Sequence, residues 1–234
     1  MALDTATYGE TRARVEDYFD RTATQTWERL TSDAPVSRVR QTVRAGRDQM
    51  RAAMLSQLPE DLTGRRVLDA GCGAGQMTAE LASRGAEVVA VDISPSLVQI
   101  AEKRLPDNLA ARVTFTSGDM LSAELGEFDH VVAMDSLIYY THDDLTDALE
   151  RLGARTMDNV VFTVAPRTPF LMAFWAAGKA FPRSDRSPVM VPHTAKKLSS
   201  GVTGALDVVE RVTSGFYISE CLSYRAGETW GDAG

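Results

Sequence analysis

The stretch that decides the fold is Arg66-Val-Leu-Asp-Ala-Gly-Cys-Gly-Ala-Gly-Gln-Met77, followed by Glu87-Val-Val-Ala-Val-Asp92. It predicts a buried strand, a glycine-rich turn, a helix and a second strand that ends in an acid. Glycine lets the backbone turn sharply beside a ligand, and the next helix presents its N-terminus there. Asp92 lies 19 residues beyond Gly73, about where a doubly wound fold places a carboxylate on a ribose diol. The stretch therefore predicts a site for an adenosyl ligand.

The spacing of the glycines narrows the choice of ligand. A dinucleotide fingerprint needs a third glycine at position 76, which is Gln76 here. Gly75 comes one residue earlier, and Asp69 precedes the first glycine by two residues. This pattern resembles motif I of the class I S-adenosylmethionine (SAM) methyltransferases. A pyrophosphate needs a cradle of helix amides, whereas SAM has none and needs an acid near its amino group. SAM is therefore the expected co-substrate, and NAD is the poorer interpretation.

Composition bounds the class of protein. A chain of 234 residues suits one α/β domain with an appendage, and 44% hydrophobic with 24% charged residues is ordinary for a soluble globular protein. The net charge of −7 argues against nucleic-acid binding. No apolar run reaches the roughly 18 residues of a membrane span, and the N-terminus lacks the features of a secretion signal. We therefore expect a cytoplasmic protein.

Neither the cysteines nor the histidines are spaced like metal ligands. Cys72 and Cys221 are far apart, so that no disulfide framework follows, and a reducing compartment is the natural setting. His130, His142 and His193 do not form a ligand cluster. We expect no metal site in the protein.

From Arg66 onward, predicted strands alternate with predicted helices, which favours a mainly parallel sheet with helices on both faces. The strands are expected at 66–70, 87–92, 113–116, 128–134 and 159–164, and the helices at 76–83, after Ser94-Pro95, and at about 143–155. Residues 206–212 and 216–224 predict an antiparallel hairpin at the C-terminus. The expected fold is α/β, the Rossmann-like class I methyltransferase fold. Its domain would span residues 61–226, with a helical cap at 1–60 and a frayed tail at 227–234.

In an open sheet of this kind, ligands bind beyond the carboxyl ends of the strands. That rule selects the residues expected to bind the co-substrate: Asp69, Gly71, Cys72, Gly73, Gly75, Asp92, Ile93, Asp119, Met120, Met134 and Asp135. Asp119 either caps a turn or accepts a hydrogen bond from the adenine amine, and we favour the second role. Asp135 is either a turn residue or, with Met134, presents its backbone to the methionine part of SAM.

The N-terminal cap is predicted to contain two helices. The first, within residues 11–30, would place Val15, Tyr18, Phe19 and Thr22 on one face. The second, after Pro35, carries five arginines and one acid. These arginines are Arg38, Arg40, Arg44, Arg47 and Arg51. They form either a solvated helix face, which we favour, or a cap over the active site that meets an anionic substrate or a partner.

Residues 165–197 form an insert that differs in charge from the rest of the chain. The insert holds six lysines and arginines against one acid, and an aromatic stretch lies inside it. It is either a packed helix with a basic loop or a lid for a flat apolar substrate that carries carboxylates. Its apolar stretch could instead rest on a membrane surface. The expected substrate-binding residues are Arg167, Phe174, Trp175, Arg183, Arg186 and His193.

Five stretches of the chain together closely resemble the magnesium-protoporphyrin IX O-methyltransferases of bacteriochlorophyll synthesis. They are Tyr18-Phe-Asp-Arg-Thr-Ala-Thr24, Asp69-Ala-Gly-Cys-Gly-Ala-Gly75, Met134-Asp-Ser-Leu-Ile-Tyr-Tyr140, Phe162-Thr-Val-Ala-Pro166 and Phe181-Pro-Arg-Ser-Asp-Arg-Ser-Pro188. The resemblance covers essentially residues 8–224. It implies SAM as methyl donor and the C13 propionate of the magnesium porphyrin as acceptor, so that the magnesium belongs to the substrate. It also implies contact with the porphyrin-binding subunit of magnesium chelatase, and such a substrate would favour peripheral contact with the inner membrane.

The chain departs from the pattern of plant and cyanobacterial members at one position. Those members look like Leu-Ile-His-Tyr where this sequence reads Leu137-Ile-Tyr139-Tyr140. A propionate has a pKa of about 4 to 5, like Glu, and needs no deprotonation at neutral pH before it attacks a sulfonium methyl. The enzyme must supply orientation and exclude water. We therefore expect Tyr18 and Tyr139, the candidate catalytic residues, to orient the substrate by hydrogen bonds.

Two other functions remain open at this point. The chain could be a SAM methyltransferase for another carboxylate or a small molecule, which predicts poor porphyrin binding. It could also be a non-catalytic delivery partner with the same fold, which predicts SAM binding without turnover. The intact glycine motif, with Asp92 and Asp119, argues against the delivery partner.

Overall fold

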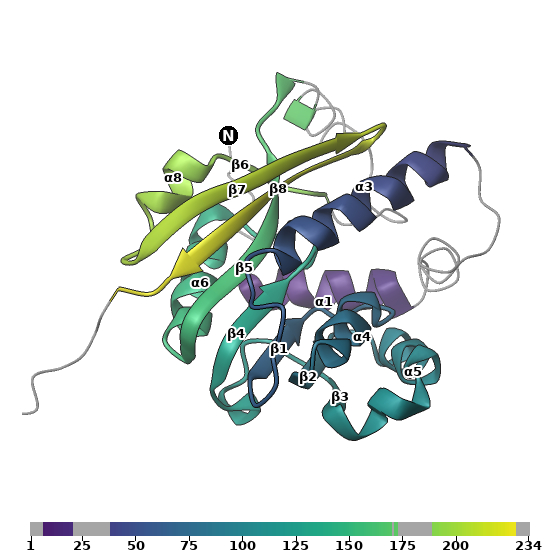
Figure 1. The fold of residues 1–234 in the computed structure, drawn as a ribbon. Coiled ribbons are helices and arrows are strands. Elements are labelled where there is room, and N and C mark those ends of the chain that lie inside the picture. The colour runs from purple at the N-terminus through teal and green to yellow at the C-terminus, as the bar shows by residue number, and fades with distance from the viewer. Residues whose placement is uncertain (1–6, 21–37, 170, 173–188, 228–234) are drawn as a thin grey trace, which may run out of the picture.

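The structure is a computed structural model that describes residues 7–20, 38–169, 171–172 and 189–227 (Figure 1). The helices are α1 (Tyr8–Tyr18), α3 (Arg38–Leu55), α4 (Gln76–Ser83), α5 (Pro95–Arg104), α6 (His142–Gly153) and α8 (Ala195–Ser199), with short 3-10 helices at Asp107–Arg112 and Ala123–Leu125. The strands are β1 (Arg66–Ala70), β2 (Glu87–Asp92), β3 (Val113–Ser117), β4 (Phe128–Ala133), β5 (Thr156–Pro166), β6 (Pro192–His193), β7 (Ala205–Ser214) and β8 (Tyr217–Arg225).

The strands form one sheet in the order β3-β2-β1-β4-β5-β8-β7, with β6 paired to β5. Strands β1 to β5 are parallel, and β8 pairs antiparallel with both β5 and β7. The chain proceeds outward from β1 to β3 on one side and from β4 to β5 on the other. The direction of strand order therefore reverses between β1 and β4, and an open α/β sheet binds its ligand at such a point. The predicted fold, including the antiparallel pair, is confirmed.

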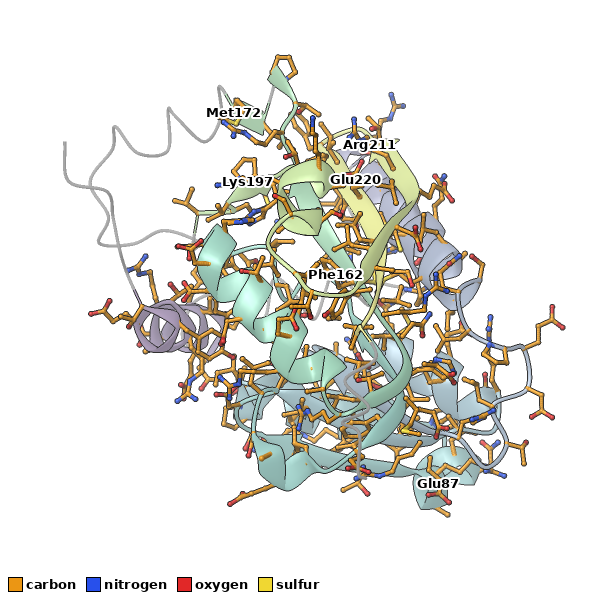
Figure 2. The ribbon with its side chains drawn as sticks, turned by 90° about the vertical axis from the view of Figure 1, so that its left-hand side faces the viewer. Glu87, Phe162, Met172, Lys197, Arg211 and Glu220 are labelled. Carbon is orange, nitrogen blue, oxygen red and sulfur yellow. The ribbon has the colours of Figure 1, made fainter. Side chains whose placement is uncertain are left out.

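Helices cover both faces of the sheet because its central strands are apolar on both sides. Successive residues of one strand enter different cores: Leu68 packs in the core that holds the apolar side chains of α6, and Val67 in the core of α3 and α4. In β5, Phe162 joins the α6 side and is fully buried. Figure 2 shows Phe162 inside the molecule, while Glu87 at the start of β2 and Met172 beyond β5 lie at opposite ends.

Several predicted bounds need correction. Strand β5 runs from Thr156 to Pro166, longer at both ends than the expected 159–164, because it pairs with β4, β8 and β6 in turn. Helix α6 ends at Gly153 rather than near Arg155. The second helix of the cap ends at Leu55 and begins no earlier than Arg38 among the described residues. The expected hairpin around Ser214 and Gly215 is confirmed.

The two described helices of the cap lie in different places. Helix α3 packs against β7 and β8, and its Met50 and Met54 are fully buried. Helix α1 passes over the end of the sheet where β1 and β4 finish, close to α3 (Figure 1). Within the described part of the chain, no helix is long and apolar enough to cross a membrane.

Candidate active site

The glycine-rich turn after β1 needs glycine for steric reasons. Gly71 has a φ of 87°, and a Cβ built on it would lie 2.3 Å from the Cβ of Ser136. Gly75, at the N-cap of α4, has a φ of 82°, and a Cβ built on it would lie 2.9 Å from the Cβ of Ala101 in α5. Both contacts would force a larger residue to displace its neighbour. The turn therefore brings backbone close to β4 and α5 and leaves the space above it open.

Asp92, at the end of β2, supports this turn directly. Its Oδ2 accepts the N–H of Gly73 at 2.8 Å, and its Oδ1 accepts the N–H of Ser94 at 2.9 Å. Burial raises the pKa of Asp92 to about 6, although both N–H bonds oppose the rise. An ionised carboxylate offers about four lone-pair sites, so it can accept further bonds from a ribose diol.

Asp69, the acid that precedes the glycines, is fully enclosed by the protein. The Thr78 hydroxyl donates to its Oδ2 at 2.6 Å. Burial raises the pKa of Asp69 to about 7 against this bond, and the nearby charge of Asp92 raises it further. Two buried carboxylates so close together favour a cation in the space beside them. SAM has a positive sulfonium and an ammonium group, so this set of donors and charges fits it.

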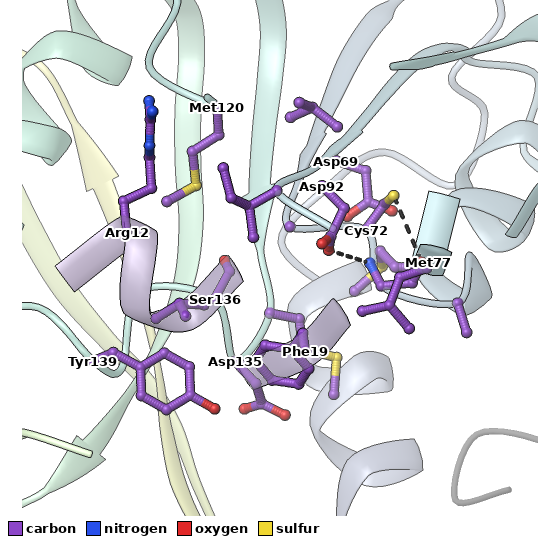
Figure 3. A pocket seen from close by; sticks show the side chains of 18 of the residues that line it. Arg12, Phe19, Asp69, Cys72, Met77, Asp92, Met120, Asp135, Ser136 and Tyr139 are labelled. Carbon is purple, nitrogen blue, oxygen red and sulfur yellow. Dashed lines mark hydrogen bonds between the residues drawn. The ribbon is translucent and has the colours of Figure 1, made fainter. Parts of the chain in front are cut away.

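A cavity of about 920 Å³, including the part open to solvent, lies over the carboxyl ends of β1, β2 and β4 (Figure 3). Ten of the eleven residues predicted to bind the co-substrate line it: Asp69, Gly71, Cys72, Gly73, Asp92, Ile93, Asp119, Met120, Met134 and Asp135. The exception is Gly75, which packs against Ala101 instead. The structure thus brings the predicted set together, and its contact with SAM remains a proposal.

One face of α1 forms a wall of this cavity. Tyr8, Arg12, Val15 and Phe19 line it at helical spacing. The predicted helix face needs one correction, because it grouped Tyr18 with Val15 and Phe19, whereas Tyr18 does not line the cavity. Thr22 lies outside the described residues.

Asp119 is bound by α1. The Tyr8 hydroxyl donates to its Oδ1 at 2.8 Å, and Arg12 donates to its Oδ2 at 3.1 Å. The N–H of Leu121 also donates to Oδ1 at 2.9 Å, so Asp119 caps its own turn as well. Burial opposes ionisation, but these donors hold the pKa of Asp119 below its usual value. The position of Asp119 is therefore compatible with both expected roles, the turn cap and the acceptor for the adenine amine. In the second role, the amine would bind a carboxylate that Tyr8 and Arg12 already orient.

Asp135 sits just after β4 in the left-handed region, with a φ of 56°. Its carboxylate forms an ion pair with Arg47 of α3 and accepts the Tyr217 hydroxyl at 3.1 Å and the Thr163 hydroxyl at 3.2 Å. Its own N–H donates to the Thr163 oxygen at 2.8 Å. The sequence singled out the backbone of Asp135 and missed this side-chain network.

Tyr139 lines the cavity and Tyr18 stands near it. Phe19 lies between them, 5.3 Å from the Tyr18 ring and 6.4 Å from the Tyr139 ring, both in edge contacts. Burial raises the pKa of Tyr139 far above its ordinary value, and the charges of Asp135 and Tyr18 add to the rise. Figure 3 shows the Tyr139 hydroxyl and the Asp135 carboxylate pointing toward each other. Tyr139 thus remains protonated at neutral pH, so that its hydroxyl can donate a hydrogen bond and does not act as a base.

Two predicted substrate-binding residues lie outside the cavity. Arg167 is exposed, and its N–H donates to the carbonyl of His193 at 3.0 Å. His193 is buried in β6, where its Nε2 lies 3.1 Å from the carbonyl oxygen of Tyr140. Burial lowers the pKa of His193 to about 4, so the ring is neutral. Its geometry gives it a packing role. Phe174, Trp175, Arg183 and Arg186 lie outside the described residues.

Two further features complete the site. Tyr8 stacks on Tyr140 with 4.8 Å between ring centroids, so α1 and the segment after β4 share an aromatic contact beside the cavity. Sequence reasoning placed Tyr140 near the site, within the stretch 134–140 that follows β4, but missed Tyr8 and Arg12, although the 8, 12, 15, 19 spacing was available as a signal. Among the residues that the structure describes, no group of three or more His, Cys, Asp or Glu side chains could hold a metal ion.

The fold and this site define a class of protein. A seven-strand path with an antiparallel last pair, a glycine turn after β1 and acids after β1 and β2 form the architecture of a SAM-dependent methyltransferase of class I. A family model described as a methyltransferase domain matches residues 67–157, and one described as the C-terminus of magnesium-protoporphyrin IX methyltransferase matches residues 133–226.

Individual relatives identify the family. The chain is 63% identical over 219 residues to the magnesium-protoporphyrin O-methyltransferase of Rhodobacter capsulatus. The aligned residues make up 93% of this chain and 98% of that one. It is 31% identical over 184 residues to the Synechocystis protein of the same name, covering 76% and 79%. The chain belongs to the magnesium-protoporphyrin O-methyltransferase family.

A solved structure supports the co-substrate. The crystal structure of the Synechocystis magnesium protoporphyrin IX methyltransferase with bound S-adenosylhomocysteine (SAH) superposes with a TM-score of 0.75 at 26% identity, covering 92% of this chain and all of that one. The resemblance seen in the sequence and the choice of SAM over NAD are therefore confirmed.

Proposed function

We propose that this protein transfers the methyl group of SAM to the C13 propionate carboxylate of magnesium protoporphyrin IX and releases the monomethyl ester. The observation that carries the proposal is the 63% identity to a magnesium-protoporphyrin O-methyltransferase, which extends over 93% of the chain. The cavity at the carboxyl ends of β1, β2 and β4 supports it, because that cavity gathers the residues predicted for SAM.

The reaction needs orientation more than acid–base chemistry. A propionate oxygen forms the new bond to the methyl carbon while the bond from that carbon to sulfur breaks and its electron pair stays on sulfur. SAH leaves neutral at sulfur, and no proton is released. The propionate is already ionised at neutral pH. The protein must therefore align the carboxylate with the methyl group and keep water away from both.

The side chains of the cavity divide these tasks. Asp92 and the Gly73 N–H it holds form the ribose end, and Asp69 supplies negative charge for the cationic part of SAM. Tyr139, which stays protonated, donates a hydrogen bond that orients the substrate. Phe19 covers the space beside Tyr139 and limits the entry of water. Tyr18 acts through these rings rather than from the cavity wall.

The insert at residues 165–197 is proposed as the lid for the porphyrin. The chemistry of its residues supports the role, because Phe174 and Trp175 suit a flat apolar ring. Arg183 and Arg186 have the fork geometry that binds carboxylates. Replacing both arginines with alanine should raise the apparent substrate constant while SAM affinity stays the same. Equal porphyrin affinity in the double variant and the parent would show that these arginines do not bind the porphyrin.

A direct assay tests the function. The purified protein is incubated with SAM and magnesium protoporphyrin, and the porphyrin is examined by mass spectrometry for a single added methyl. The same assay with a panel of other carboxylates tests the alternative of a different acceptor. SAM binding by calorimetry without methyl transfer to any acceptor would favour a delivery partner over an enzyme.

Contact with the porphyrin-binding subunit of magnesium chelatase is proposed as the route by which the substrate arrives. Peripheral membrane contact is a separate proposal. Phe216, at the tip of the β7–β8 hairpin, is 66% exposed and offers an apolar contact for either surface. Phe216→Ser should reduce capture by the purified subunit if the tip meets the chelatase. It should instead reduce cosedimentation with anionic vesicles if the tip meets a membrane. Unchanged behaviour in both assays would remove the hairpin tip from both proposals.

A further inference from the structure

Arg47 of α3 has a largely buried charged side chain that lines the cavity. Its side chain is 13% exposed and forms an ion pair with Asp135, whose side chain is 9% exposed. Both residues line the cavity. The pair joins α3 to the segment after β4 across 88 positions of sequence. A buried guanidinium at the cavity wall is costly unless its charge is used, because desolvating an ion opposes folding.

Asp135 is held in place from three sides. Besides Arg47, it accepts the Tyr217 hydroxyl from β8 and the Thr163 hydroxyl from β5. Its backbone adopts a left-handed conformation that is uncommon for a residue other than glycine. The Asp135 carboxylate is thus largely occupied by protein donors and is poorly suited to bind a substrate itself. Its position fixes the plane of the Arg47 guanidinium.

The acidic side chains around the cavity affect the ionisation of a carboxylate substrate. Four described acids line it: Asp69, Asp92, Asp119 and Asp135. Burial already raises the pKa of Asp69 to about 7 and that of Asp92 to about 6. A propionate that enters the same space would be pushed toward its protonated form, which is a poor nucleophile. The sulfonium of SAM offsets part of this effect, and a guanidinium beside the propionate would offset more of it.

Among the described residues, three arginines line the cavity: Arg12, Arg47 and Arg51. Arg12 is engaged with Asp119 at 3.1 Å, and Arg51 pairs with Asp48 of its own helix at 2.8 Å. Arg47 pairs instead with Asp135, whose carboxylate points toward the Tyr139 hydroxyl in the same cavity (Figure 3). The positive charge of Arg47 also lowers the pKa of Tyr139 against the larger effect of burial.

We propose that Arg47 binds the acceptor carboxylate of the substrate and that Asp135 is the positioning residue that holds Arg47 for this contact. The inference rests on the proposed function and names the binding group for the acceptor. A guanidinium has five N–H donors in a planar fork, so one such group can contact two carboxylates. It can bind one carboxylate oxygen of the propionate while the other oxygen faces the methyl group.

This arrangement gives a reason for the strained conformation of Asp135 and for the arginine-rich sequence of α3. The guanidinium keeps the propionate ionised and fixes its orientation, and the Tyr139 hydroxyl can bind the same group. It also makes the site selective for an acid, because an ester or amide in the same place would leave Arg47 with a poorer partner.

The test compares two porphyrins that differ only in their carboxyl groups, magnesium protoporphyrin IX and its dimethyl ester. Fluorescence titrations give the affinity of the parent protein, Arg47→Gln and Arg47→Lys for each. Arg47→Gln should weaken binding of the diacid by about 10- to 100-fold and leave the dimethyl ester within about twofold. Arg47→Lys should lose only part of this preference, because it keeps the charge without the fork.

Arg44→Gln is the matched control, because Arg44 lies on the same helix one turn away and does not line the cavity. It should leave the affinity for both porphyrins unchanged. Asp135→Asn should weaken binding of the diacid more than that of the dimethyl ester, since it disturbs the orientation of Arg47 together with the Tyr217 and Thr163 hydrogen bonds. Circular dichroism and the thermal unfolding midpoint of every variant show whether the fold is intact, because Arg47 and Asp135 line the SAM cavity themselves. If Arg47→Gln does not fold, Arg47→Lys decides the question.

The outcomes separate this inference from the proposed function. If the parent protein methylates the porphyrin but Arg47→Gln and Arg47→Lys keep the full preference for the diacid, the role of Arg47 is wrong and the function stands. If the parent forms no methyl ester, the proposed function fails whatever Arg47 does. Loss of affinity for the diacid and the dimethyl ester alike would show a structural role and would also overturn the inference.

Discussion

The Tyr8 hydroxyl donates a hydrogen bond of 2.8 Å to Oδ1 of Asp119, across 111 positions of sequence. This bond and the Arg12 ion pair to the same carboxylate fasten α1 to the segment after β3. Tyr8 also stacks on Tyr140, which follows β4. Helix α1 thus forms one wall of the cavity through contacts on two sides, and we expect these contacts to slow ligand exchange.

Tyr8→Phe should speed the dissociation of SAM by a few-fold, because it removes one hydrogen bond and keeps the aromatic stack. Tyr8→Ala should have a larger effect, since it removes both contacts. Stopped-flow displacement of SAM by excess SAH measures the rate. Equal rates in the parent and both variants would show that α1 does not control release.

The sequence could not reveal this wall of the cavity, and the reason is physical. The spacing of Tyr8, Arg12, Val15 and Phe19 shows that they share a face, but periodicity alone does not say which surface the face meets. The partner, Asp119, belongs to a different part of the chain. By contrast, the glycine turn and Asp92 were predictable because short-range rules of strand, turn and helix fix both.

Asp92→Asn should weaken SAM binding by about 10- to 100-fold. An asparagine has only one acceptor oxygen, whereas Asp92 accepts the N–H of Gly73 on one oxygen and that of Ser94 on the other. The amide NH₂ would face one of these N–H groups and could not accept from a ribose hydroxyl. Calorimetry gives the affinity, and thermal unfolding reports whether the turn survives. An unchanged SAM affinity would show that Asp92 does not bind SAM.

SAM affinity should rise by at least about tenfold between about pH 5 and pH 8. Without ligand, the pKa of Asp69 lies at about 7 and that of Asp92 at about 6, so both carboxyls are largely protonated at the lower pH. The cationic ligand favours their ionised forms, and binding near neutral pH should therefore release protons. Calorimetry in buffers with different ionisation enthalpies measures that release.

Asp69→Asn is the matched control for this pH dependence. It should remove most of the change near pH 7 and leave the part near pH 6 that belongs to Asp92. The stability of the ligand-free fold has the opposite pH dependence to SAM affinity. Because both folded-state pKa values lie above the unfolded value of about 3.9, the free energy of unfolding should fall as pH rises from about 4 to 7. A flat SAM affinity over this range would contradict the assignment of both acids.

Tyr139→Phe should lower kcat only modestly, by about tenfold or less. The residue donates a hydrogen bond, and its raised pKa keeps it from acting as a base. A general base would cost about 10²- to 10⁴-fold when removed. The pH–rate profiles of parent and variant decide between the roles. A rate that rises with pH toward the raised pKa of Tyr139 in the parent, and does not rise in the variant, would show that Tyr139 accepts a proton after all.

The substrate side of the site was harder to predict than the SAM side. The charge pattern of the cap favoured a solvated face, yet the structure brings Arg47 and Arg51 to the cavity wall. A run of arginines every three or four residues looks alike whether it faces water or a buried acid. Asp135 becomes the partner of Arg47 because α3 crosses both β8 and the end of β4 in the folded protein. The sequence pattern of α3 does not contain this tertiary contact.

A single-turnover experiment tests the central claim most directly. The protein is loaded with SAM whose methyl group carries deuterium and is mixed with a limiting amount of magnesium protoporphyrin. Mass spectrometry then follows the porphyrin over time in the parent and in Asp92→Asn. The account predicts a monomethyl ester that retains all the deuterium, formed rapidly by the parent and much more slowly by Asp92→Asn at the same SAM concentration. Absence of the ester, or an ester without the label, would contradict it.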